Sequence, residues 1–291
     1  MFIIKYKSIF IGISALLVVS AVSLFFIFGM KMGIDFTGGT TIEMSYLSPT
    51  ASDALNLEDV RALGVDAFKT GTTSYKFITA LSYDEINPKL QAVLSQGGKE
   101  AYLETQVNTV GPSLGKEMTR KALIAIVIVV LAILSFIAFS FREVSHPVSS
   151  WKYGLSAMLT MVHDIVIPAG VYVLLSHVYG AEVNTLFVIG LLTVMAVTIS
   201  DKIVVFDRIR ENLKTKKGTF DEIVGMSLRQ TAVRSINTSL TTVLALVALY
   251  IFGPESTKFF SITLIVGMVV GTYSSICVAS PILTLFVKGK K

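Results

Sequence analysis

The chain of 291 residues is 53% hydrophobic and only 15% charged, and its mean hydropathy is +0.70. This composition excludes a soluble globular domain and indicates a protein that lies mostly in a membrane. The formal net charge of +5 falls largely on segments that flank apolar runs, so it describes membrane topology and does not indicate nucleic-acid binding.

Six apolar runs are long enough to cross a hydrocarbon core about 30 Å thick, which takes roughly 18 or more helical residues. The first run is too long for a signal-peptide core and lacks a small-residue cleavage site, so we expect it to remain as an anchor. The runs span residues 8–30, 121–141, 154–176, 183–206, 235–252 and 259–287.

The distribution of Lys and Arg predicts the orientation of these runs. A group of cations lies in the loop 207–234, between the fourth and fifth runs, and others precede the first run and follow the sixth. The short loops 176–183 and 253–259, on the opposite side, carry Lys258 as their only Lys or Arg. By the positive-inside rule, both termini and the loop 207–234 are expected in the cytoplasm.

The polar segment 31–118 follows the first run and is therefore expected outside the cytoplasm. Asn56 is placed to cap one helix, whose apolar face would include Ala67, and Asn87-Pro88 is placed to start a second helix that ends at Gly97-Gly98. Alternating apolar residues predict three strands, with room for a fourth that the pattern hides. The predicted strands cover residues 41–47, 74–81 and 102–109. This small α/β domain has no His, Cys or phosphate loop, so it is expected to make contacts and not to perform chemistry.

Two ionisable residues of opposite charge lie in adjoining runs, Asp201 in the fourth and Arg234 at the start of the fifth. A charge near the bilayer centre costs on the order of 2.5–3.5 kcal/mol, so the pair is a candidate for moving protons. Small and polar residues recur beside both at helical spacing, which favours two faces that pack together and hold Asp201 close to Arg234. These residues are Gly190, Thr193, Val197, Ser200 and Val204 in the fourth run, and Asn237, Thr238, Thr241, Ala245 and Ala248 in the fifth. The alternative is that Arg234 is a flanking cation and Asp201 a solvated acid at a helix end.

The third run carries a second candidate, His163 with Asp164. The two residues are interpreted either as a proton relay or as a buried hydrogen-bonded pair that keeps helices in register. Gly267 and Gly271 match the GxxxG spacing, for which close helix packing is the favoured role. Pro168 and Pro281 are placed to kink their helices.

Four stretches resemble the motifs of the SecD/SecF family, in family order from the first run to the fifth. The stretch 33–40, with Gly33, Asp35, Gly38 and Gly39, is similar to the family's first motif, and 111–115, with Gly111 and Pro112, to its second. The stretch 204–211, with Asp207 and Arg208, and the stretch 237–242 are similar to later motifs of the SecF branch. The first motif is expected to shape a turn and not to bind a ligand, and Asp207 with Arg208 to form a charged cluster at a helix end.

One stretch departs from the family pattern. Where the family usually reads Gly-Tyr-Ser-Ile-Asn-Asp-Thr, residues 196–202 read Ala-Val-Thr-Ile-Ser-Asp-Lys. The acid, Asp201, is retained, and Lys202 follows it. Lys202 could pair with a neighbouring acid or extend its ammonium group to the cytoplasmic edge of the membrane.

The resemblance implies a membrane all-α fold of six transmembrane helices, half of a twelve-helix bundle of the resistance-nodulation-division superfamily, with a small ferredoxin-like domain between the first two helices. The expected divisions are 1–30, 31–118 and 119–291. The family's membrane acid would fall on Asp201 and its arginine on Arg234. The implied activity is proton-driven promotion of protein export in the bacterial cytoplasmic membrane. The implied partners are a SecD-like subunit, the SecYEG channel, YajC and an unfolded preprotein.

Two other classes stay open: a half-transporter of the same superfamily for lipids or small molecules, and a non-transporting assembly subunit. An enzyme is not expected, since the sequence shows no nucleophile–base set, metal-ligand spacing or cofactor motif. The three histidines, His146, His163 and His177, are scattered along the chain.

Overall fold

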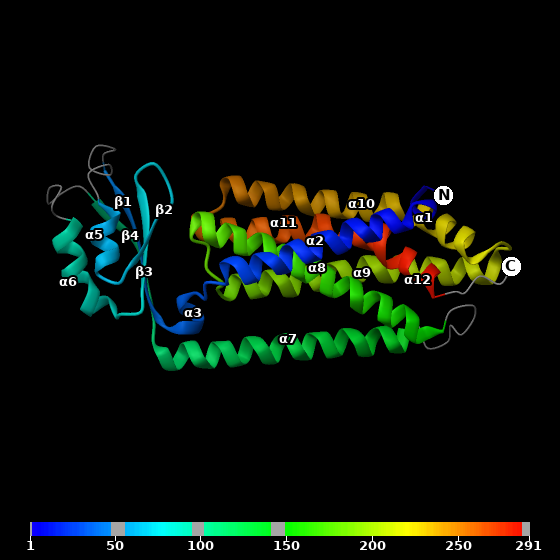
Figure 1. The fold of residues 1–291 in the computed structure, drawn as a ribbon, viewed down its shortest axis with the longest axis horizontal. Coiled ribbons are helices and arrows are strands. Elements are labelled where there is room, and N and C mark those ends of the chain that lie inside the picture. Colours follow the sequence, from blue (N-terminus) through cyan, green and yellow to red (C-terminus); the bar gives the residue numbers. More distant parts are fainter. Residues whose placement is uncertain (1, 48–55, 95–101, 141–148, 287–291) are drawn as a thin grey trace. The chain divides into compact units, whose positions relative to one another are not determined.

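The computed structural model describes residues 2–47, 56–94, 102–140 and 149–286. The chain divides into two compact units, each of which is described by itself. The bundle unit comprises Met1–Gly29, Ala125–Leu174 and Leu186–Lys291, and the sheet unit comprises Met30–Ile124 and Leu175–Thr185. Figure 1 shows the helices and the sheet in the colours of the sequence.

Six helical stretches within the described residues are long and apolar enough to cross a membrane, which confirms the six predicted spans. A short helix, α1 (Phe2–Lys5), precedes the first of them. The spans are α2 (Lys7–Phe28), α7 (Pro112–Ser140), α8 (Ser150–Tyr179), α9 (Thr185–Thr215), α10 (Phe220–Phe252) and a last stretch that begins with α11 (Lys258–Ser274). A short 3₁₀ turn, Glu255–Thr257, precedes α11.

The segment 207–234, expected as a loop, is mostly helical. Helix α9 continues to Thr215 and α10 begins at Phe220, so the connection between them narrows to residues 216–219. A capping box starts α10: the Thr219 side chain accepts a hydrogen bond from the Glu222 backbone amide, and the Thr219 amide donates to the Glu222 carboxylate at 2.8 Å. Hydropathy marks the part of a helix that crosses hydrocarbon, and these helices extend past it.

The last span is interrupted where a proline was expected to kink it. A π-helical turn, Ser275–Ala279, follows α11 and leads into α12 (Ser280–Leu285), which has Pro281 in its first turn. Proline has no backbone N–H, so it removes one helical hydrogen bond, and a wider turn accommodates that loss. Pro168, by contrast, lies inside α8, which continues as a helix on both sides of it.

The sheet unit has the strand order β2-β3-β1-β4 with every neighbouring pair antiparallel, and two helices alternate with the strands in the order βαββαβ. This is the ferredoxin-like arrangement that was predicted. The strands are β1 (Gly39–Tyr46), β2 (Asp66–Lys69), β3 (Ser74–Thr79) and β4 (Tyr102–Val110), and the helices are α5 (Leu57–Ala62) and α6 (Tyr83–Leu94).

The hidden fourth strand is β2, and Ala67, assigned from the sequence to the face of a helix, is a buried residue of this strand. Helix α5 ends at Ala62, and the chain then turns at Gly64, whose φ is 77°. Asn56 caps α5 as predicted, because its side chain accepts a hydrogen bond from the Glu58 amide. Helix α6 begins at Tyr83 and not at Asn87-Pro88, while its predicted end at residues 97–98 lies outside the described residues.

Candidate functional site

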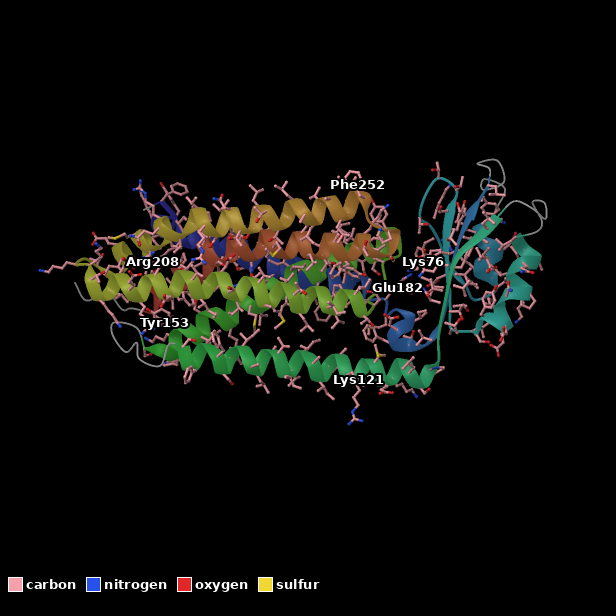
Figure 2. The ribbon with its side chains drawn as sticks, turned by 180° about the vertical axis from the view of Figure 1, so that it is seen from behind. Lys76, Lys121, Tyr153, Glu182, Arg208 and Phe252 are labelled. Atoms are coloured by element: carbon pink, nitrogen blue, oxygen red, sulfur yellow. The ribbon has the colours of Figure 1, made fainter. Side chains whose placement is uncertain are left out.

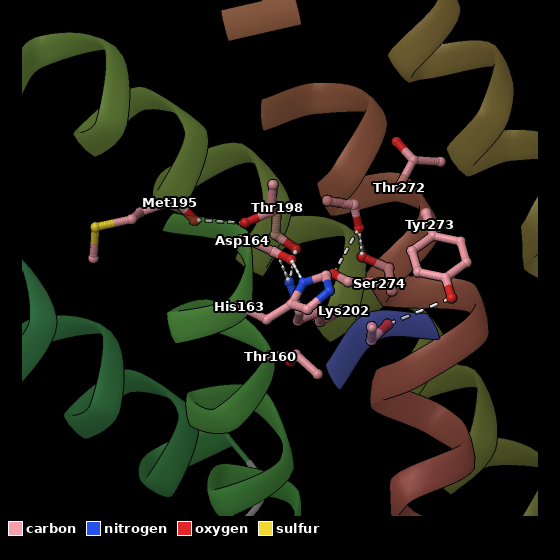
Figure 3. A network of polar contacts seen from close by, with 12 residues as sticks. Thr160, His163, Asp164, Met195, Thr198, Lys202, Thr272, Tyr273 and Ser274 are labelled. Atoms are coloured by element: carbon pink, nitrogen blue, oxygen red, sulfur yellow. Dashed lines mark hydrogen bonds and ion pairs between the residues drawn. The ribbon is translucent and has the colours of Figure 1, made fainter. Parts of the chain in front are cut away.

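The most deeply buried charges of the bundle unit form an ion pair between two helices. Lys202 of α9 donates to the carboxylate of Asp164 of α8, and both side chains are 0% exposed. Figure 3 shows the two groups in contact among α8, α9 and α11. Burying two charges is tolerated only when each compensates the other, since one unpaired charge would carry a desolvation cost of several kcal/mol. The pairing answers the question left by the sequence: Lys202 binds an acid, and its side chain is buried.

His163 completes the environment of the same carboxylate. Its Nδ1 lies 3.0 Å from one Asp164 oxygen, and the other oxygen accepts from Lys202. His163 is 6% exposed, and in the described part of the chain its Nε2 has no hydrogen-bond partner. The Ser274 side chain of α11 lies beside Asp164, and the Lys202 ammonium is also 3.4 Å from the Thr198 carbonyl. Three helices therefore meet at one carboxylate, as the interpretation of a buried hydrogen-bonded pair requires.

Glycines of α11 form the groove into which α9 packs. A Cβ atom at Gly267 would lie 2.2 Å from the side chain of Val194, and one at Gly271 would lie 2.0 Å from that of Thr198. Val194, Thr198 and Lys202 follow one another at four-residue steps, so they form a single ridge on α9. The GxxxG motif thus has the packing role that was favoured.

Asp201 lies outside this cluster. It is half-buried on α9, while Arg234 of α10 is exposed in the single chain. Arg234 and Lys202 act electrostatically on Asp201, but among the described residues Asp201 and Arg234 form no direct ion pair. The structure therefore brings the predicted pair within electrostatic range and leaves both groups without the tight partner that Asp164 has.

The two predicted polar faces do not pack on each other over their length. Thr193 and Ser200 of α9 are exposed, as are the polar residues that accompany Arg234 on α10. The reason is α11, onto which both helices pack: a Cβ at Gly190 of α9 would lie 3.4 Å from the Phe260 ring, and Ser239 of α10 shares a hydrogen bond with Thr272. The exposed polar residues of α10 are Asn237, Thr238 and Thr241.

In the sheet unit, the first family motif holds the start of α9. The Asp35 carboxylate accepts a hydrogen bond from the Thr185 amide at 2.8 Å, and the Gly33 amide donates to the Val183 carbonyl at 2.8 Å. A carboxylate at a helix N-terminus satisfies a free N–H group and interacts favourably with the helix dipole. Asp35 therefore caps Thr185, the first residue of α9, within the sheet unit.

The loop before α9 is tied to the sheet by a second contact. Glu182 pairs with Lys76 of β3 at 3.3 Å (Figure 2), with the Glu182 side chain only 10% exposed. Burial raises the pKa of the Glu182 carboxyl, and the nearby Lys76 charge opposes that shift. Sequence patterns gave no signal for this pair, because the two residues lie in different predicted elements.

The two glycine-containing motifs pack against each other. Gly38 has a φ of 78°, and a Cβ there would lie 2.8 Å from Pro112. A Cβ at Gly115 would lie 2.8 Å from the Gly38 amide, and one at Gly39 would lie 2.3 Å from the Thr79 carbonyl. These positions require glycine for close backbone approach. Gly111, in the same turn, has open space around it.

The charges that follow the fourth span lie at the surface of α9. Arg208 pairs with Glu211 at 2.7 Å, and Asp207 lies 3.9 Å from Arg210.

Sequence reasoning missed a buried residue nearby, Asn212, which donates to Ser227 at 2.8 Å and to Gln230 at 2.9 Å and so joins α9 to α10. The described residues contain no group of three or more His, Cys, Asp or Glu side chains that could hold a metal ion.

Comparisons with known proteins agree with this architecture. A family described as "Protein export membrane protein SecD/SecF, C-terminal" matches residues 89–289, and the SecD/SecF GG motif matches residues 23–46. A protein translocase subunit SecF of Thermobaculum terrenum is 37% identical, with 97% of this chain and 92% of that protein covered.

Two longer relatives contain a corresponding region. The protein translocase subunit SecDF of Brucella abortus is 31% identical over 97% of this chain, which corresponds to 36% of that protein. The crystal structure of SecDF from Thermus thermophilus, described as a translocon-associated membrane protein, matches 97% of this chain and 38% of its own with a TM-score of 0.81 and 31% identity. With its six spans, its ferredoxin-like sheet and its two matching motif regions, the chain belongs to the SecD/SecF family of protein-export membrane proteins.

Proposed function

We propose that this chain is the SecF-like half of a Sec accessory complex, which works with a SecD-like subunit and uses the proton-motive force to promote protein export. Its relatives are named as protein translocase subunits, which supports a role in the Sec pathway. The observation that carries the proton-dependent part is the uncovered polar face of α9 and α10, with Asp201 and Arg234 at its charged end.

A SecD-like subunit is the proposed cover of that face. Charged and polar side chains in a bilayer are expensive in contact with lipid, so they are usually found facing other protein or water-filled cavities. In the two SecDF relatives, the region similar to this chain accounts for 36% and 38% of the length. We infer that the remainder of each SecDF chain contains the SecD-like half that covers this face. The SecYEG channel, YajC and the preprotein are proposed as further partners from family membership.

Asp201 is the proposed site of proton uptake. In its ionised form it interacts with the positive charge of Arg234, and protonation would remove that attraction and alter how α9, α10 and the partner helices pack. One proton that crosses the membrane supplies roughly 2.3 kcal/mol per 100 mV. This energy is comparable to the cost of rearranging a small number of polar contacts, so the half-buried Asp201 and the exposed Arg234 suit a two-state element.

We place the chain in the bacterial cytoplasmic membrane with both termini in the cytoplasm. Two contacts within the bundle unit support one common side for the basic segments. Lys7, at the start of the first span, pairs with Asp221, at the start of the fifth, at 3.1 Å. Lys152, at the start of the third, donates to the Phe286 carbonyl, at the end of the sixth, at 3.0 Å. The positive-inside rule then assigns this side to the cytoplasm.

The proposal is tested by preprotein export into membrane vesicles that contain the chain with its SecD-like subunit. We expect Asp201→Asn to remove the stimulation of export by a proton gradient while the ATP-dependent part remains. The matched control is Asp207→Asn, which neutralises an exposed acid of the same helix and should leave the stimulation unchanged. Full stimulation with Asp201→Asn would refute proton coupling through this residue and favour an assembly subunit.

A further inference from the structure

We propose that the buried Asp164–Lys202 pair is a positioning device: it fixes the rotation of α9 about its axis so that Asp201 faces Arg234. Asp164 and Lys202 are thus positioning residues and not proton carriers. This inference rests on the proposed role of Asp201 in proton coupling. It also assigns a role to Lys202, which follows the membrane acid and is one of the residues at which the stretch 196–202 departs from the family pattern.

The argument begins with helix geometry. Consecutive residues of an α-helix point about 100° apart, so the direction of Lys202 determines the direction of Asp201. Lys202 points into the core and binds Asp164 of α8. Asp201 therefore points to the neighbouring side, where it is half-buried and acts electrostatically with Arg234 of α10.

The pair also completes a row of contacts along one face of α9. Val194 and Thr198 lie against Gly267 and Gly271 of α11, and Lys202 is the next residue of the same ridge. The first two contacts are apolar and involve small residues. They would therefore still pack if α9 rotated about its axis by less than the angle between two consecutive residues. The ion pair cannot follow such a turn, because a rotated Lys202 would leave the 0% exposed carboxylate of Asp164 without its cation.

The surroundings of Asp164 indicate a fixed charge. Its two oxygens are occupied by His163 Nδ1 and by Lys202, and Ser274 lies beside it. Thr198 contributes a carbonyl to the Lys202 ammonium at 3.4 Å. A carboxylate that is held by partners from its own helix and from a second one has little freedom to exchange them. Asp201, with no direct ion pair in the described residues, has that freedom.

The experiment measures the position of residue 201 relative to residue 234 by cross-linking. Asp201→Cys and Arg234→Cys are combined with Cys277→Ser, because Cys277 is the only native cysteine. Full-length protein with its SecD-like subunit is treated in membranes, without a proton gradient, with a short bis-maleimide. The cross-linked fraction is compared for the native pair and for the double variant Asp164→Asn with Lys202→Met, which leaves neither charge unpaired.

We expect the double variant to accumulate at native levels, because both buried charges are removed together. We also expect its 201–234 cross-linked fraction to fall to about a third, as it would if three rotational settings of α9 became equally populated. A control pair, Ser239→Cys with Thr272→Cys, joins α10 to α11 and does not involve α9. Its cross-linked fraction should stay the same in both backgrounds.

A native 201–234 fraction in the double variant would overturn the positioning role, because neutral packing would then hold α9 equally well. A double variant that does not accumulate would overturn it as well, since the pair would then be needed for folding itself. The proposed function is tested separately by Asp201→Asn in the export assay, with the native pair present. Either result can fail without the other, so the two claims are distinguishable.

Discussion

The buried ion pair between Asp164 and Lys202 can be tested by a double-mutant cycle. We expect the two single substitutions to lower the free energy of unfolding by different amounts. Asp164→Asn replaces the carboxylate by a neutral amide, so the Lys202 ammonium group, which is 0% exposed and also lies near the Thr198 carbonyl, loses its counter-charge. Removing one member of a buried pair costs about 3–5 kcal/mol, and we expect the upper end for this variant. Lys202→Met leaves the Asp164 carboxylate with the Nδ1 of His163 and the side chain of Ser274 as hydrogen-bond partners. This variant is therefore expected at the lower end of the range.

The cycle closes with both substitutions together. The neutral double variant should lie within about 1 kcal/mol of the native protein, because replacing a buried pair by apolar or neutral groups is often neutral or stabilising. The free energies are measured by denaturant titration of the purified protein in mild detergent. Glu211→Gln, which breaks an exposed pair with Arg208, serves as the control and should cost between 0 and about 1 kcal/mol. A cost below about 1 kcal/mol for Asp164→Asn would refute the view that the pair is closed and desolvated.

Three further predictions concern other contacts. Gly271→Ala should destabilise by about 1–3 kcal/mol, because its Cβ would lie 2.0 Å from a side chain of α9; Gly12→Ala, with open space around it, is the control in the same denaturant titration. Asp35→Ala should destabilise the first turn of α9 by about 0.5–2 kcal/mol, the range for the loss of a helix cap, and amide hydrogen exchange at that turn measures it; unchanged exchange would contradict the capping role. Because burial raises the pKa of Glu182 above its ordinary value of 4.5, the carboxyl binds protons more tightly in the folded state. Its contribution to stability should decline as pH rises from 4.5 through the raised pKa, and Glu182→Gln should remove that part of the pH dependence.

Periodicity predicted the parts of the fold in which residues along one element share an environment. The alternation along β1 placed Ile42 and Met44 on a buried face, and both are 1% exposed in the structure. The strand β2 was missed because four residues are too few to show a period, and its buried Ala67 continued the apolar spacing of α5. The extensions of α9 and α10 between residues 207 and 234 were missed because hydropathy is insensitive to the parts of a helix that lie outside the hydrocarbon.

The candidate site shows a different limit. Spacing along one helix predicted which residues share a face, and Asp201 does lie on a polar face of α9. Spacing contains no information on which helix lies opposite that face, so the packing of both α9 and α10 onto α11 was not predicted. The partner of Lys202 was also left open, because Asp164 lies 38 positions away on another helix and only tertiary structure brings the two together.

The bundle unit contains two sets of charged residues, Asp164 with Lys202 and Asp201 with Arg234. The two sets differ in the energy that is needed to rearrange them. One proton that crosses the membrane at 100 mV supplies about 2.3 kcal/mol, whereas separating a buried, fully paired charge costs about 3–5 kcal/mol. At that potential, a single proton would not open the pair between Asp164 and Lys202. Asp201 and Arg234 have no direct ion pair to break in the described residues, and Arg234 is exposed in the single chain. A two-state element needs arrangements of similar free energy, so Asp201 with Arg234 is suited to respond to a proton, and the buried pair of Asp164 and Lys202 to keep α9 in place.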